Sequence, residues 1–181
     1  IESLHYTSKE GTDLTIGFMA DSIFMGGGES SVGRGGYFQP NIPSEECLTS
    51  PNSGEAEGIV YATMPLSYQG NLIENFWIRF ENGKAVECGA EKNKEILQKI
   101  LDMDEGASKL GECALVPNKS PIRKSGILFY NTLFDENATC HLALGAGFDN
   151  CVRGYEEKGK EKCKEEGVNE SIIHVDFMIG S

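Results

Sequence analysis

The sequence predicts an α+β fold: a mixed, largely antiparallel sheet with few helices. Segments of alternating or β-branched character outnumber helical ones and recur along the whole chain. An Asn82-Gly83 pair, typical of a two-residue hairpin turn, joins two of them. Residues 91–101 form the one clear amphipathic helix, because their apolar side chains recur at three- and four-residue intervals. Together these observations give the fold class.

Length and composition limit what the protein can be. A chain of 181 residues can bury one substantial core or two small ones. Its formal charge of −12 argues against nucleic acid or an anionic membrane as a partner, because both need a basic face. No apolar run is long enough to span a bilayer, and there is no signal-peptide pattern. The six cysteines form no C-x-x-C pair, which favours free thiols in a reducing cytoplasm over disulfides or a cysteine-based zinc site.

The first third of the chain contains a predicted strand and two loops. Residues 12–18 alternate in polarity as a strand does. Residues 26–36 are dense in glycine but lack the motifs of a phosphate-binding P-loop or a dinucleotide fold. They predict a flexible surface loop, either a lid or a loop that faces the substrate. The prolines of residues 40–43 predict a stiff turn that positions Glu45 and Glu46 at its end.

The middle third has the clearest local signals. Strands are predicted for residues 57–63 and 72–80, and the tight turn predicts a hairpin over residues 76–88. The helix of residues 91–101 follows. Residues 104–110 then predict a second, short helical turn with an aspartate as its N-cap.

The last third combines apolar strands with ionisable side chains. Residues two apart in a strand point to the same face, so His174 and Asp176 of the final strand share one face. Such a pair is costly to bury unless it is satisfied. The predicted segments are strands at 111–117, 126–130 and 171–180, and a solvated loop or short helix at the Lys/Glu-rich residues 154–167.

Few ionisable residues lie in an apolar sequence context. Two imidazoles and four carboxylates could hold two divalent metal ions, with a water activated between them. Nitrogen and carboxylate oxygen suit zinc, cobalt or manganese. The simpler alternative is that these groups only satisfy one another, because an H-x-D spacing is common by chance. The residues are Glu46, Glu112, Glu136, His141, His174 and Asp176.

Several long motifs resemble those of one family, the thermophilic metalloaminopeptidases (peptidase family M29, the aminopeptidase T and S type). The resemblance runs in collinear order over essentially the whole chain. It implies that residues 1–181 are the C-terminal, metal-binding catalytic domain fragment of a two-domain enzyme, without the family's N-terminal domain and final segment. The start at Ile1 rather than Met fits that expectation. The motifs include G-T-D-L-T-I-G, P-N-I-P-S-E-E, D-E-G-A-S-K-L-G-E-C-A-L-V-P, S-G-I-L-F-Y-N-T-L-F-D-E-N-A-T-C-H-L-A-L-G and G-V-N-E-S-I-I-H-V-D-F-M-I-G-S.

The resemblance implies that the same six residues are metal ligands. Glu112 would bridge both metals, and Glu136 would be either a ligand or a proton carrier. Glu46 adjoins Glu45, so the choice between these two stays open. One position departs from the family, which often has a tyrosine where this chain has Phe148. A phenyl ring cannot donate a hydrogen bond to a reacting carbonyl, so Tyr130 or Tyr155 would have to replace it, or the hydroxyl is dispensable.

The function implied by the resemblance is that of a two-metal aminopeptidase. Water activated between two zinc, cobalt or manganese ions would attack the first peptide bond, and Glu46 or Glu136 would carry the proton to the leaving amine. Peptides with a free N-terminus would be the substrates, and the protein would be a homodimer. Three alternatives remain: another dinuclear amide hydrolase, a metal-binding or dimerisation half that is inactive on its own, and a structural domain with solvated acidic residues.

Overall fold

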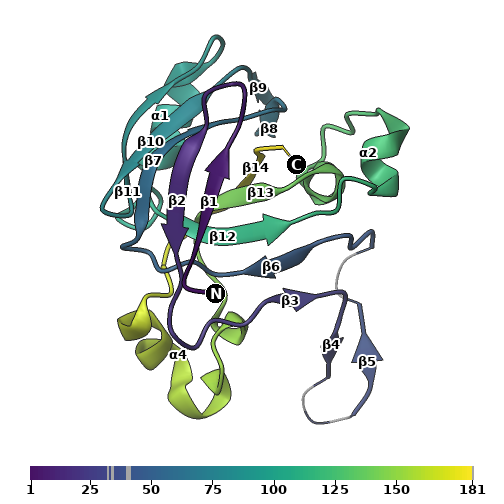
Figure 1. Ribbon diagram of the computed structural model, residues 1–181, viewed down its shortest axis with the longest axis vertical. Coiled ribbons are helices and arrows are strands. Elements are labelled where there is room, and N and C mark those ends of the chain that lie inside the picture. The colour runs from purple at the N-terminus through teal and green to yellow at the C-terminus, as the bar shows by residue number, and fades with distance from the viewer. Residues whose placement is uncertain (32, 34, 40–41, 181) are drawn as a thin grey trace.

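The computed structural model describes residues 1–31, 33, 35–39 and 42–180. Two five-stranded sheets form its body (Figure 1). All strand pairings among the described residues are antiparallel, which confirms the predicted fold class. In spatial order, the first sheet contains β1 (Ser3–Thr7), β2 (Asp13–Gly17), β7 (Ala56–Tyr61), β10 (Trp77–Glu81) and β11 (Lys84–Gly89). The second contains β14 (His174–Met178), β13 (His141–Gly145), β12 (Leu110–Leu115), β6 (Cys47–Thr49) and β3 (Met25–Gly26).

The main core is shared by the two sheets. Leu14 and Ile78 of the first sheet belong to the same buried cluster as Leu142 and Phe177 of the second. Helix α1 (Lys94–Leu101) adds its apolar face to this cluster. Burying each such side chain stabilises the fold by about 1.5–3 kcal/mol. One apolar face of the second sheet is thereby occupied, and its polar side chains are left to the opposite face.

Smaller elements surround the two sheets. A smaller apolar cluster includes Val152 and the buried Cys163 of α4. In Figure 1, α2 and the β4–β5 hairpin extend at the right, whereas α4 lies at the lower left. These elements are β4 (Glu29–Ser30), β5 (Tyr37–Phe38), β8 (Leu66–Tyr68), β9 (Asn71–Ile73), α2 (Pro121–Ser125), α3 (Thr132–Asp135), α4 (Tyr155–Glu166) and the 3₁₀ turns η1 (Glu136–Ala138) and η2 (Asp149–Cys151).

Most of the predicted segments form as expected. The strand at 12–18, the strand at 57–63 and the hairpin at 76–88 correspond to β2, β7 and β10–β11. The predicted helix begins at Lys94, and the Lys/Glu-rich stretch is the short helix α4. All six cysteines are free thiols. Among the described residues, none of the helices has both the length and the apolar character needed to cross a membrane.

Three predicted segments are wrong. Residues 72–80 are two strands of different sheets, because Asn75 adopts a left-handed φ of 50° and turns the chain between them. Residues 126–130 form no strand; they follow the short helix α2, which ends at Gly126 in the left-handed region. The stretch 104–110 forms turns rather than a helix, although the Asp104 carboxylate accepts a hydrogen bond from the Ala107 amide as a cap would.

The glycine-dense stretch 26–36 is not wholly irregular, since it includes the end of β3 and all of β4. Val32 and Arg34 of this stretch lie outside the described residues, as do Pro40 and Asn41 of the predicted stiff turn. Strands β1 and β6 were not predicted by the sequence patterns. Both are short, with five residues in β1 and three in β6, so neither has a long alternating pattern.

Candidate metal centre

Three neighbouring strands carry four of the candidate residues to one face of the second sheet. His141 lies on β13, with β12 on one side and β14 on the other. Ala143 of the same strand is opposite both Glu112 and Asp176, and Gly145 is opposite His174. Residues opposite one another in antiparallel strands share a face. The register of these three strands thus brings together Glu112, His141, His174 and Asp176, which are distant from one another in the sequence except for the last two.

A β-bulge gives Glu112 its direction. Leu110 is opposite Leu144, yet Glu112 is opposite the next residue, Ala143, so Gly111 is an extra residue in β12. A Cβ atom at Gly111 would lie 2.2 Å from the carbonyl oxygen of Ala146, so only glycine fits there. The bulge places Leu110 in the apolar core and Glu112 on the opposite face, where regular alternation would have put both on one face.

The two remaining candidates come from loops. Glu46 immediately precedes β6, and Glu136 is the first residue of η1. The side chain of Asn137 ties these segments together: it accepts a hydrogen bond from the Glu45 amide at 2.6 Å and donates one to the Leu133 carbonyl at 3.0 Å. As a result the Glu46 carboxylate, rather than that of Glu45, enters the cluster.

The two imidazoles face the carboxylates through their Nε2 atoms. Nε2 of His141 lies 3.1 Å from Glu46 Oε2 and 3.3 Å from Glu112 Oε1. Nε2 of His174 lies 3.1 Å from Glu112 Oε2 and 3.3 Å from Asp176 Oδ1. The two oxygens of Glu112 therefore address different imidazoles. Each Nδ1 atom contacts a backbone carbonyl, at 3.2 Å for His141 and 2.7 Å for His174, which fixes the ring orientation.

The electrostatics of the cluster show how strongly its charges interact. Burial opposes ionisation of Glu112, but hydrogen bonds from the two imidazoles outweigh it and lower its pKa to about 2. Burial likewise opposes a charged His174, yet bonds to Asp176 and Glu112 raise its pKa to about 10. The pKa of His141 is raised in the same way by two carboxylates. Burial and the charge of Asp176 raise the pKa of Glu136 to about 8. Positive charge is therefore favoured at the imidazole positions.

The donor geometry fits divalent cations. Three triads have ligand atoms that all lie within 4.8 Å of one another. Glu46 Oε2 and His141 Nε2 are buried, and neither forms a hydrogen bond of good geometry, although they face each other. Buried polar atoms without such a bond are rare and call for a partner. Mixed nitrogen and oxygen donors suit zinc, cobalt or manganese. The triads are Glu46–Glu112–His141, Glu112–His174–Asp176 and Glu136–His141–Asp176.

Phe148, Tyr130 and Tyr155, which the sequence analysis named, lie in different surroundings. The rings of Phe148 and His174 are in contact at a centroid distance of 4.9 Å with their planes tilted by 48°, and the Phe148 amide donates a hydrogen bond to Ser50 Oγ at 2.7 Å. Tyr130 is 61% exposed, and the Tyr155 hydroxyl donates to Glu156. Ser50, which is fully buried, was not singled out by the sequence patterns. Nor was the buried Asn137.

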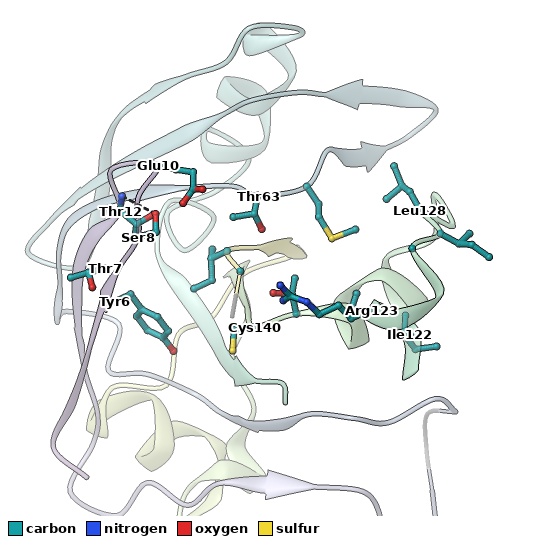
Figure 2. A pocket seen from close by; sticks show the side chains of 17 residues that line it. Tyr6, Thr7, Ser8, Glu10, Thr12, Thr63, Ile122, Arg123, Leu128 and Cys140 are labelled. Atoms are coloured by element: carbon teal, nitrogen blue, oxygen red, sulfur yellow. Dashed lines mark hydrogen bonds between the residues drawn. The ribbon is translucent and has the colours of Figure 1, made fainter. Parts of the chain in front are cut away.

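A large cavity lies away from the cluster. It has a volume of about 670 Å³ and contains none of the six candidate residues. Figure 2 shows Tyr6 and Glu10 on one side of it and Ile122, Arg123 and Leu128 on the other. A cavity of about 260 Å³, lined by Glu46 and Phe148 among others, opens instead beside the cluster. Size alone therefore does not identify the chemical site in this fold.

Comparisons with known proteins identify relatives of the chain in sequence and in structure. The chain is 51% identical to aminopeptidase AmpS of Bacillus subtilis (strain 168) and 47% identical to aminopeptidase T of Thermus aquaticus. Each match covers 99% of this chain and 43% of the relative, so the chain spans less than half the length of these curated relatives. The solved structure of wild-type AmpT from Thermus thermophilus matches with a TM-score of 0.90 at 44% identity, over 99% of this chain and 44% of that one.

The family comparison covers the entire sequence. A family described as thermophilic metalloprotease (M29) matches residues 1–181. Four of the five quoted motifs that carry the resemblance supply the six clustered side chains. The chain therefore belongs to the thermophilic metalloprotease (M29) family.

Proposed function

We propose that the protein takes part in peptide hydrolysis as a two-metal aminopeptidase. The observation that carries this proposal is the set of three overlapping triads, which share Glu112, His141 and Asp176. Six donors arranged with shared members suit two adjacent cations better than one. The relatives in the same family are named aminopeptidases. Because the chain spans 43% of their length, the activity is a proposal for this chain rather than a transfer of their names.

Each residue has a role that follows from its position. Two bound divalent cations would activate a water and polarise the carbonyl of the first peptide bond. Glu112 directs one oxygen towards each imidazole, which is the placement expected of a bridging carboxylate. Backbone contacts at Nδ1 leave Nε2 of His141 and His174 facing the carboxylates, where both atoms would be available as metal ligands.

Proton transfer falls to one of the two loop carboxylates. Glu46 and Glu136 each belong to one triad only, whereas three other members are shared between triads. A carboxylate that takes part in only one candidate metal site could accept a proton from the attacking water and deliver it to the leaving amine. Separate Glu46→Gln and Glu136→Gln variants would tell which one acts, because the carrier's variant should lose turnover while keeping both metals.

The substrates would be peptides with a free amino terminus. The protonated α-amine is a cation, and the cluster and the net charge of −12 both favour cations. We further propose that the protein is a homodimer in the cytoplasm. Zinc, cobalt and manganese are all compatible with the donor set.

The test compares hydrolysis of leucine p-nitroanilide with that of its N-acetylated form. The protein is stripped with a chelator and reloaded with zinc, cobalt or manganese. Turnover of the free-amine substrate only, restored by metal, is the expected result. Equal turnover of both substrates would indicate another amide hydrolase and overturn the aminopeptidase proposal. Two bound ions without any turnover would mean that this chain is a metal-binding half that lacks activity by itself.

A further inference from the structure

A cavity of about 260 Å³ opens directly beside the metal-type cluster. It shares Glu46 with the cluster, and the ring of Phe148, which also lines it, contacts the ring of His174. Ligand pockets for drug-sized molecules usually have about 300–1,000 Å³. This cavity is thus suited to one side chain rather than to several residues of a peptide. A residue whose carbonyl lies at the cluster would have its own side chain within reach of this space.

Three glycines and three apolar side chains form much of the cavity wall. Met25, Leu48 and Phe148 supply apolar surface. Gly28 lies against the neighbouring hairpin so closely that a Cβ atom would be 2.6 Å from the Phe38 carbonyl oxygen. Glycine at position 28, which lines the cavity, therefore allows the chain to pack closely against β5. An aliphatic stem would pack well against such walls.

The cavity has one carboxylate besides that of the cluster. Glu29 lines it, and Asn150 Nδ2 donates a hydrogen bond to Glu29 Oε1 at 2.7 Å. Within the part of the chain that the structure describes, Glu29 is in no ion pair with a lysine or arginine. This hydrogen bond orients the Glu29 carboxylate through Oε1. The other carboxylate oxygen, Oε2, could then accept a hydrogen bond from a ligand.

We propose that this cavity receives the side chain of the substrate's first residue, and that Glu29 makes it select a cationic one, arginine or lysine. The methylene stem would contact the apolar walls, and the charged end would meet Glu29. Asn150 acts as a positioning residue through its bond to Glu29. The inference deepens the proposed function and rests on it, because it assigns the substrate side chain for the same site.

The test measures kcat/KM for arginine and leucine p-nitroanilides with the metal-loaded protein and with Glu29→Gln. The ratio of arginine to leucine should fall roughly ten- to hundredfold in the variant, because a charge-assisted hydrogen bond contributes about that factor. Glu95→Gln is the matched control: it removes the same charge from an exposed position in α1 and should leave the ratio unchanged. Glu29→Lys should reverse the preference towards glutamate p-nitroanilide.

A second measurement separates failure of this inference from failure of the proposed function. Calorimetric binding of L-argininamide and L-leucinamide needs no turnover. Tighter binding of argininamide that is lost in Glu29→Gln, without hydrolysis of any substrate, would support the pocket and overturn the aminopeptidase proposal. Hydrolysis with the same arginine-to-leucine ratio in the parent and in Glu29→Gln would overturn the pocket and leave the aminopeptidase proposal standing.

Discussion

Replacing His174 with alanine should remove one metal site and spare the other. His174 belongs to one triad only, Glu112–His174–Asp176, whereas the triad Glu46–Glu112–His141 does not contain it. The expected metal content therefore falls from two ions per chain to about one. The His174 side chain is 28% exposed, so its truncation leaves little buried void and should not unfold the protein.

The size of the effect follows from the number of donors lost. In the proposed site, His174 would supply one of the three protein ligands of its triad and the only nitrogen. Loss of an outer-shell partner alone costs about 10–100-fold in metal affinity, so loss of a direct ligand should cost at least about 100-fold, or roughly 2.7 kcal/mol. The ion held by the other triad should bind within about tenfold of its original affinity, because its three donors are unchanged.

The assay is elemental analysis of the dialysed protein, followed by titration of zinc against a competing chelator. His5→Ala is the matched control. His5 is a 56% exposed imidazole that pairs with Asp13, and both residues lie on the first sheet, whereas the cluster lies on the second. This control should keep both ions. Loss of both ions in His174→Ala, or of neither, would refute the assignment of separate triads.

Four further outcomes are expected. Glu112→Gln should lose both ions, as measured by elemental analysis, because each oxygen of Glu112 faces a different imidazole. Phe148→Tyr should raise kcat by about tenfold or more if position 148 reaches the reacting carbonyl, since one such donor contributes on the order of 10²–10³; an unchanged kcat would show that the hydroxyl is dispensable. Leu142→Ala should lower the free energy of unfolding in urea by about 2–5 kcal/mol, because this fully buried residue leaves a cavity. Asp104→Asn should cost about 1 kcal/mol near neutral pH, as followed by thermal melts. Hydrogen bonds from the Ile172 amide and neighbouring donors lower the pKa of Asp104, so its contribution is present above about pH 4 and is lost as the pH falls through the lowered value.

The fold class could be predicted because its strongest local signals agree with the tertiary structure. The Asn82-Gly83 turn and the alternation of β2 are independent of distant contacts. The errors arose where one local signal was weighed above another. Residues 126–130 are apolar, but Ile127 is 55% exposed, and the preceding Ser120-Pro121 pair is a helix start that outweighs hydrophobicity.

The ionisable members of the candidate centre could be picked out from the sequence because each interrupts an apolar stretch. Their juxtaposition could not, since it depends on the register of β12, β13 and β14 and on a loop contact through Asn137. The adjacent cavity could not be predicted from the sequence either. Glu29 lies in a glycine-dense stretch that gives no pattern, and Asn150 is a polar residue 121 positions away.

The extra residue in β12 has a consequence for anyone who moves this centre to another scaffold. In a regular strand the side chains alternate between the two faces without interruption, so Leu110 and Glu112 would lie on the same face. In β12 the bulge at Gly111 reverses this alternation. Leu110 therefore packs in the apolar core, whereas Glu112 lies among the charged groups of the opposite face. If the same residues were transferred to a strand without a bulge, the Glu112 carboxylate would point into the apolar core. A transplant of the centre must therefore carry the interruption along with the ligands.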